Sequence, residues 1–458
     1  MSKPIYLPLA NNAVPLSEDW LALTFVDKHQ DQFRWSSGMD WMFFDGNRYI
    51  RDKNVLKRFE LARKICRELS AAQSDPKLKE RLSSSKTVAN LLSLAKSDSR
   101  LIVPAEDWDA ETSSINTPEG LVNLKTGKTT PSSSRHLVTK QTVVAPKPGA
   151  CPRWERFLCE VFPNQPEIVD FMQVLMGYVM TGSISEQKIF FFFGKGSNGK
   201  SVLLSLLEWI LGDYSMKLSA SVLMQSRYTQ HPTELAQLQG KRFAASSELE
   251  DGQYWAEARL KELTGDDTIS ARFMRGDFFE FNQTQTHLIA GNYRPKLKGG
   301  DEAIQRRMVL IPFKAKFEGE ARDDHLQDKL RKEGPQILHW MIQGAIRWHT
   351  EGLTIPGTVK KESSEYMQLM DDIAQWMDDC CEVNPDSNEG TQRLYESFRS
   401  WKIRNGEKYP PSLVQWRERV IAQYPDIHPG KRKTRGASLN GICLTHEEVR
   451  LSEYDRNT

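Results

Sequence analysis

The stretch KIFFFFGKGSNGKSVLLSLLEWIL, residues 188–211, decides the fold of this chain. Its four phenylalanines, residues 190–193, form an apolar run that predicts a strand buried on both faces in a parallel sheet. A glycine-rich run follows, and apolar residues then recur with helical spacing as far as Gly212. The sequence therefore predicts a strand, a loop with the G-x-x-x-x-G-K-[ST] pattern, and a helix.

The loop predicts a site for a nucleoside triphosphate. Its glycines let backbone N–H groups line an anion nest, and the following helix adds the positive end of its dipole. The Lys200 ammonium is expected to reach the β- and γ-phosphates, and the Ser201 hydroxyl to ligate Mg²⁺. The predicted nucleotide-binding residues are Gly194, Lys195, Gly196, Ser197, Asn198, Gly199, Lys200 and Ser201.

Length and composition bound the class of protein. The 458 residues suffice for about three domains. The net charge is only +2, so any affinity for nucleic acid must come from local patches. No apolar stretch approaches the roughly 20 residues that span a bilayer, and the N-terminus lacks the apolar core of a signal peptide. We expect a cytoplasmic protein with reduced cysteines, no structural metal and no membrane partner.

The region before the loop predicts three parts. Residues 1–110 predict a mixed α/β domain with a hairpin of aromatic strands around the turn at residues 45–46. The aromatic side chains of this hairpin are expected to pack on the sheet, with stacking on bases as the alternative. Residues 111–150, rich in Thr, Ser, Pro and Gly, predict a linker-rich segment, and residues 151–185 predict a compact helical unit.

Two segments after the loop predict further parts of the site. Residues 241–252 predict a strand that ends in Glu248 and Glu250, which strand alternation places on one face. One carboxylate would hold Mg²⁺ and the other would polarise the attacking water, and an exposed acidic turn is the alternative. A second apolar strand ends at Asn292, an amide that can orient the lytic water.

Three basic features point to partners. Residues 269–281 predict a β-hairpin with Arg272 and Arg275 near its tip, where they either contact a DNA strand or are solvated. Arg306 and Arg307 precede an apolar strand and suggest an arginine finger that acts across a subunit interface, or merely a charged strand entry. Residues 399–435 carry a net charge of +7 with interleaved aromatics, which indicates a nucleic-acid surface or a solvated face.

The motifs GKGSNGKS, SSELEDG, LKELTGDDTISARFMRGDFFEF, HLIAGNYRP and AIQRRMVLIPF follow one another in this order. Together they resemble superfamily 3 helicases, specifically the phage and plasmid P4-type helicase domain related to the poxvirus D5 protein. The resemblance implies an α/β fold with an AAA+-type P-loop ATPase core. The implied parts are a helical collar for oligomerisation at 151–185, the ATPase core at 186–318, a helical extension at 319–371 and a basic winged-helix-like domain at 372–458.

The resemblance also implies roles for single residues. Lys200 matches the Walker A lysine, Glu248 and Glu250 match the Walker B acids, and Asn292 matches sensor 1. Glu248 and Ser201 would hold Mg²⁺, and Arg306 or Arg307 would be the finger, with Arg307 favoured because it directly precedes the strand. The implied DNA-binding residues are Lys261, Arg272, Arg275, Lys431, Arg432 and Lys433.

The implied function is an ATP-dependent DNA helicase that forms a ring, with a hexamer favoured, and acts on single-stranded and forked DNA. It would act in the replication of a phage, plasmid or other mobile element in a bacterial host cell. No polymerase-type acidic triad is recognised before the loop, so a primase, like a single-strand-binding protein, would be a separate partner. Leu249 separates the two acids, which leaves their roles open. The alternative is a P-loop origin-binding initiator, or an ATP-dependent DNA switch, that does not translocate.

Overall fold

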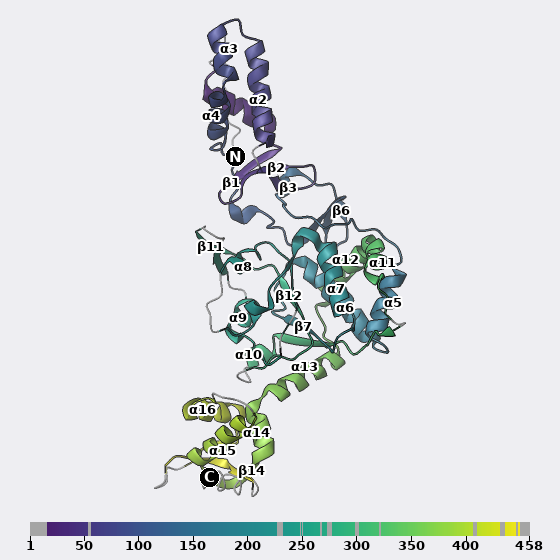
Figure 1. Cartoon of the computed structure of the whole chain (residues 1–458), viewed down its shortest axis with the longest axis vertical. Coiled ribbons are helices and arrows are strands. Elements are labelled where there is room, and N and C mark those ends of the chain that lie inside the picture. Colours follow the sequence, from purple (N-terminus) through teal and green to yellow (C-terminus); the bar gives the residue numbers. More distant parts are fainter. Residues whose placement is uncertain are drawn as a thin grey trace.

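A computed structural model shows three parts along one long axis: an N-terminal module, a central domain and a C-terminal domain (Figure 1). It describes residues 16–53, 56–226, 232–247, 249, 251–265, 268–272, 277–297, 302–319, 322–405, 410–430, 436–445 and 448. No helix in these ranges is long and apolar enough to cross a membrane.

The N-terminal module joins a small antiparallel sheet to four helices. The predicted hairpin is confirmed, because β2 and β3 pair antiparallel with Phe44 opposite Tyr49. Trp41 and Tyr49 are buried, so these aromatic side chains pack on the sheet as expected. The elements are α1 (Glu18–His29), β1 (Phe33–Ser36), β2 (Asp40–Phe44), β3 (Tyr49–Arg51), α2 (Leu56–Ala71), α3 (Pro76–Ser83) and α4 (Ser85–Ala95).

Residues 111–150 differ from the expected linker. They form a three-stranded sheet of β4 (Ser114–Thr117), β5 (Gly120–Asn123) and β6 (Thr129–Thr130). Its apolar side chains are buried in the core of the central domain. Arg242 of that domain donates hydrogen bonds to the carbonyls of Glu111 and Ser114, which ties the segment down. The residues that favour turns predicted the tight turns of this segment correctly. They did not reveal that the short strands between the turns are buried.

The central domain is built on a parallel five-stranded sheet in the order β13-β7-β12-β9-β8. The predicted phenylalanine strand is confirmed as β7, and it has parallel neighbours on both sides and buried side chains on both faces. The strands are β7 (Ile189–Phe193), β8 (Ser215–Lys217), β9 (Phe243–Ser246), β12 (Thr286–Gly291) and β13 (Met308–Pro312).

Helices cover one face of this sheet as a single core. The predicted helix after the loop is α7, and it shares its buried side chains with α5 and α6 of the expected collar and with α12. The helices α5 and α6 of the compact helical unit predicted for residues 151–185 therefore share one core with α7. The helices are α5 (Pro152–Val161), α6 (Pro166–Thr181), α7 (Lys200–Leu211), α11 (Leu326–Lys332) and α12 (Gly334–Glu351).

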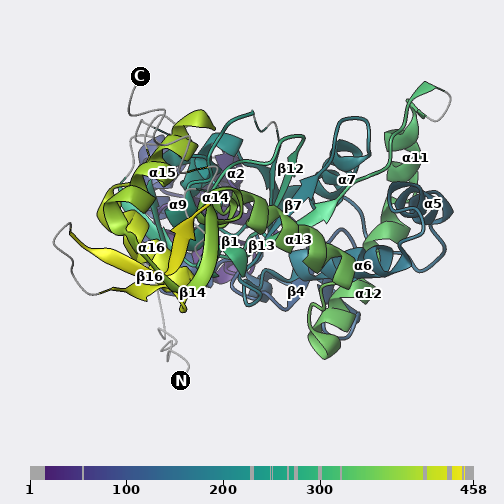
Figure 2. The same cartoon turned by 90° about the horizontal axis from the view of Figure 1, so that it is seen from below.

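The other face of the sheet carries the hairpin and the helix that leads out of the domain. The predicted hairpin consists of β10 (Ile269–Arg272) and β11 (Phe278–Phe281), which pair antiparallel. Helix α13 (Gly357–Met370) packs on β13, where the Ser363 hydroxyl accepts a hydrogen bond from the Leu310 N–H. Figures 1 and 2 show α13 running from the central sheet to the C-terminal domain. The short helices of this face are α8 (Pro232–Ala236), α9 (Glu257–Glu262) and α10 (Glu302–Gln305).

The C-terminal domain combines three helices with an antiparallel sheet in the order β14-β16-β15. Trp376 and Trp416 lie edge to face in its core, with centroids 5.6 Å apart. Along the chain the order is helix, strand, two helices and two strands. The elements are α14 (Asp372–Cys380), β14 (Cys381–Gly390), α15 (Thr391–Arg404), α16 (Leu413–Gln423), β15 (His428–Pro429) and β16 (Ser438–Leu444).

Candidate nucleotide-binding site

The loop of residues 194–199 lies at the edge of the sheet where the parallel strands end. It connects β7 to α7 and leads directly into the positive end of the α7 dipole. Lys195, Gly196 and Ser197 are exposed at its crest, whereas Asn198 and Lys200 are buried. Ser201 is exposed in the first turn of α7. The eight predicted residues thus form the loop and the first turn of α7, and they carry two lysines, Lys195 and Lys200.

The Lys200 ammonium is held by three hydrogen bonds. Its Nζ donates to the Gly194 carbonyl at 2.5 Å, to Asn198 Oδ1 at 2.9 Å and to Asn292 Oδ1 at 3.2 Å. Three acceptors match the three donors of an ammonium group. Burial lowers the pKa of Lys200 to about 8. An anion that enters the loop would favour the charged form and restore the usual pKa.

The segment after β13 holds the backbone of the loop in place through two hydrogen bonds. Asn198 Nδ2 donates to the Phe313 carbonyl at 3.1 Å, and the Phe317 N–H donates to the Ser197 carbonyl at 2.7 Å. A Cβ at Gly194 would lie 2.2 Å from the Phe313 carbonyl oxygen, so only glycine fits at this position. The two hydrogen bonds explain how six loop residues keep a defined shape.

Asn292 stands beside the loop because of the strand order. β12 lies between β7 and β9, so the residue after β12 faces both the loop and the chain after β9. Leu249 lies against Gly291, since a Cβ there would be 2.8 Å from its Cδ1. Glu248 and Glu250 themselves lie outside the described residues. Lys200 and Asn292 are thus brought together. Leu249, which lies between the two predicted glutamates in the sequence, contacts the end of β12 next to Asn292.

Arg306 and Arg307 lie at the opposite edge of the sheet. They precede β13, whose first residue pairs with Ile189 at the start of β7. A five-residue strand spans about 16 Å, so these arginines cannot reach the loop of their own chain. The Arg307 guanidinium donates to Thr264 Oγ1 at 3.0 Å and to the Ala303 carbonyl at 2.8 Å. Arg306 is exposed.

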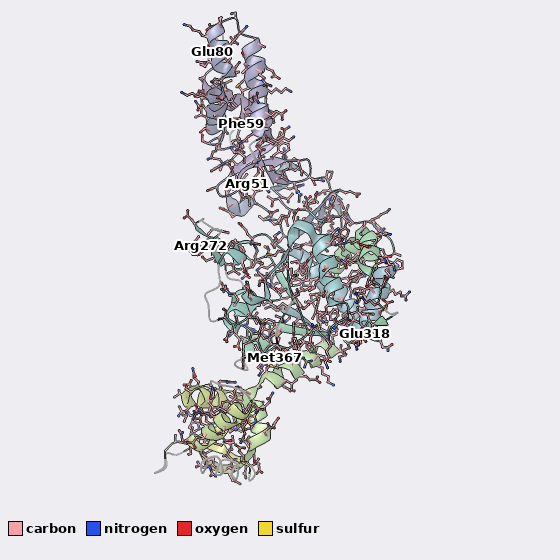
Figure 3. The ribbon with its side chains drawn as sticks, viewed as in Figure 1. Arg51, Phe59, Glu80, Arg272, Glu318 and Met367 are labelled. Atoms are coloured by element: carbon pink, nitrogen blue, oxygen red, sulfur yellow. The ribbon has the colours of Figure 1, made fainter. Side chains whose placement is uncertain are left out.

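The predicted DNA-binding residues are only partly visible. Arg272 is exposed on the hairpin (Figure 3). Its guanidinium carbon lies 5.0 Å from the ring centroid of Phe278. The Phe278 side chain was not predicted, although it is 63% exposed. Its exposure could have been inferred from strand alternation opposite Arg272. Lys261 is half-buried in α9. The described ranges omit Arg275, Lys431, Arg432 and Lys433.

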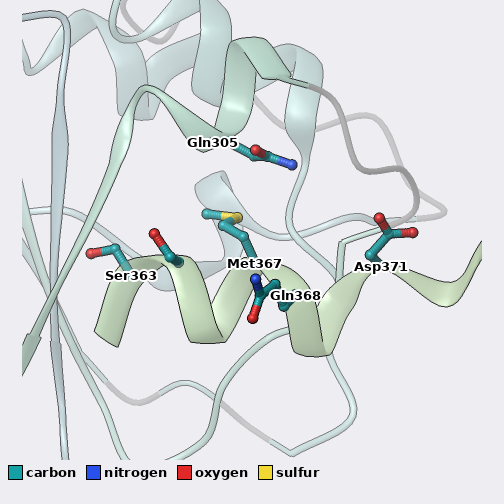
Figure 4. A pocket seen from close by; sticks show the side chains of 6 residues that line it. Gln305, Ser363, Met367, Gln368 and Asp371 are labelled. Carbon is teal, nitrogen blue, oxygen red and sulfur yellow. The ribbon is translucent and has the colours of Figure 1, made fainter. Parts of the chain in front are cut away.

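A separate pocket of about 280 Å³ lies between α10 and α13 (Figure 4). Gln305, which directly precedes Arg306, forms one wall, and α13 forms the other. It therefore lies at the arginine edge of the sheet, away from the loop. Its lining residues are Gln305, Ser363, Ser364, Met367, Gln368 and Asp371.

A parallel sheet with a glycine-rich loop at its carboxyl edge is consistent with an α/β nucleotide-binding fold. Comparison with known proteins adds the following. Residues 22–163 match the family described as "D5 N terminal like", and residues 192–307 match a "Family of unknown function (DUF5906)". The first match covers most of the N-terminal module and the sheet of residues 111–150, and the second covers the loop and the arginine pair.

The relatives are viral proteins. The chain is 24% identical over 293 residues to a "Putative helicase" of Acanthamoeba polyphaga mimivirus, which covers 59% of this chain and 30% of that protein. It is 27% identical over 195 residues to a "Putative primase" of African swine fever virus, which covers 41% of this chain and 20% of that protein. The chain thus spans less than a third of these relatives.

A solved structure shares the architecture. The apo structure of the NrS-1 C terminal region (305-718) matches with a TM-score of 0.50 and 12% identity. The match covers 94% of this chain and 100% of that one, so it supports the same overall fold across nearly the whole chain.

Proposed function

We propose that this chain is an ATP-dependent DNA helicase of the superfamily 3 type, which acts in DNA replication as a ring of identical subunits, six in the favoured case. The observation that carries the proposal is the contact of Lys200 with Asn292 at the carboxyl edge of the sheet. Viral relatives named as helicases and primases support a replication role.

The loop residues fit Mg²⁺-bound ATP. Gly194 leaves the backbone open, Lys200 supplies a buried cation, and Ser201 presents a hydroxyl at the helix start. Hydrolysis supplies the free energy for movement. Asn292 would orient the attacking water, and Glu248 and Glu250 would share the roles of metal ligand and base.

The placement of the arginines supports the proposed ring. Because Arg306 and Arg307 cannot reach the loop of their own chain, a finger must act on the site of a neighbouring subunit. We assign that role to Arg306, which is exposed, whereas Thr264 and Ala303 already engage the Arg307 guanidinium.

DNA would contact two parts of the chain. Arg272 and Phe278 offer a cation and an aromatic face on the hairpin, which suits the phosphates and bases of a single strand. Lys261 and Arg275 would add to this surface. The order of helices and strands in the C-terminal domain suits a winged helix, and Lys431, Arg432 and Lys433 follow β15, where a wing would begin. Cytoplasmic action in a bacterial host and a separate primase or single-strand-binding protein remain part of the proposal.

Strand displacement on forked DNA tests the function. With ATP and Mg²⁺ the chain should unwind a fork that has one tail polarity, and Lys200→Ala should abolish unwinding while leaving the fold intact. DNA-stimulated ATP hydrolysis without unwinding would favour an origin-binding initiator or a DNA switch that does not translocate. A chain with no ATP hydrolysis would contradict both.

A further inference from the structure

Arg294 lies beside the nucleotide-binding loop and was not among the predicted site residues. Its guanidinium carbon lies 4.2 Å from the ring centroid of Phe193, the last residue of β7 before the loop. Asn292, two residues earlier, accepts a hydrogen bond from Lys200. Because two residues of chain span about 7 Å at most, Arg294 is anchored close to the space that the Lys200 ammonium faces.

Arg294 has hydrogen-bonding capacity to spare. Its ion pair with Glu362 of α13 is long, with 3.6 Å between Nη2 and Oε2, whereas a strong charged hydrogen bond is about 2.7–2.9 Å. Its Nε is buried and has no hydrogen-bond partner within the described part of the chain. The contact with the Phe193 ring holds the guanidinium in place without using any of its N–H groups.

Glu362 is shared with a second cation. Lys314 Nζ lies 2.5 Å from Glu362 Oε1, and Lys314 directly follows Phe313, whose carbonyl holds Asn198 of the loop. One carboxylate thus balances two cations, and the buried Lys200 adds a third positive charge nearby. Positive charge in excess beside an anion nest favours a polyanionic ligand.

We propose that Arg294 is a phosphate-contacting residue. Its guanidinium would break the ion pair with Glu362 and bind the terminal phosphate of a nucleoside triphosphate. This inference rests on the proposed function. A guanidinium presents paired N–H donors that match two phosphate oxygens, and the buried Nε, which has no partner within the described part of the chain, would gain one if the side chain turned to a phosphate. Glu362 lies on α13, the helix that links the central and C-terminal domains. Nucleotide binding would therefore remove one ion pair that this helix makes with the central domain.

The test compares the affinities of the full-length chain for ADP and for a non-hydrolysable ATP analogue, both with Mg²⁺, by calorimetry. Arg294→Ala should weaken binding of the ATP analogue about tenfold or more, the effect of losing a charged hydrogen bond, and change ADP binding less than about twofold. Arg294→Lys should restore part of the loss. Glu362→Gln removes the competing carboxylate and should tighten binding of the ATP analogue about twofold to threefold, again without effect on ADP.

A matched control is Lys361→Ala, because Lys361 is the exposed neighbour of Glu362 on α13. Equal losses for ADP and the ATP analogue in Arg294→Ala would mean that Arg294 only supports the loop, and would overturn the inference. So would unchanged affinities in both Arg294→Ala and Glu362→Gln. Should Arg294→Ala not fold, Glu362→Gln decides alone. A wild-type chain that binds neither nucleotide would instead contradict the proposed function.

Discussion

Lys200 shows how burial prepares a single residue for its ligand. Desolvation lowers the pKa of Lys200 to about 8, and three oxygen acceptors fix the position of its Nζ. At neutral pH the group is still mostly charged, but the charge is poorly compensated because all three acceptors are neutral. A phosphate would supply the missing negative charge.

This state predicts a pH dependence of nucleotide binding. Phosphate favours the protonated form, so the pKa of Lys200 is higher in the complex than in the free chain. Affinity for ATP should therefore be constant below pH about 8 and fall as the pH rises above it, by up to about tenfold per pH unit. Calorimetric titration between pH 7 and 9.5 measures the profile.

The control for this profile is Lys200→Arg, since a guanidinium stays charged throughout the range. That variant should bind ATP more weakly but with an affinity that does not depend on pH. If wild type and variant have the same slope above pH 8, a group other than Lys200 titrates, and the assignment is wrong.

At the scale of elements, the central domain depends on one close helix crossing. Gly177 of α6 and Gly344 of α12 bring the two backbones together, because a Cβ on Gly177 would lie 2.0 Å from the Ala345 nitrogen. This crossing packs α12 onto the helix that precedes the phenylalanine strand. The site therefore rests on a contact that leaves no room for a methyl group.

Gly177→Ala should destabilise the central domain by about 3 kcal/mol, because the clash is with backbone that can move only if the helices separate. Thermal unfolding of the whole chain, followed by tryptophan fluorescence, measures the effect. Gly357→Ala is the matched control, since Gly357 in α13 has open space around its Cα and alanine there favours the helix. A melting temperature unchanged by Gly177→Ala would show that the crossing can relax.

Sequence patterns predicted the elements that carry strong local signals. The buried run of β7, the glycine loop and the turn between β2 and β3 are local features, and each was placed correctly. Residues 111–150 were misjudged because two- to four-residue strands have no periodicity, and only tertiary burial reveals them. Arg294 was missed for a related reason, since its contact with Phe193 joins the segment after β12 to the end of β7, far apart in the sequence.

At the scale of the whole molecule, the sheet separates the two halves of the proposed site. Lys200 and Asn292 lie at its carboxyl edge, and Arg306 lies at its amino edge. If an arginine finger serves the proposed site, it must come from another copy of the chain, and a head-to-tail arrangement that closes gives the proposed ring. The structure shows that Lys200 and Arg306 lie at opposite edges of the sheet. The ring is our proposal.

Mixing two inactive variants tests the ring. Lys200→Ala lacks the loop cation and Arg306→Ala lacks the finger, so each alone should lose about 10³-fold or more in ATP turnover. In an equal mixture, about a quarter of the head-to-tail interfaces would combine an intact loop with an intact finger, and turnover should return to about that fraction of the wild-type rate. Arg307→Ala in place of Arg306→Ala tests which arginine is the finger. A mixture as inactive as its components, in chains that sediment as oligomers, would rule out a finger that acts between subunits.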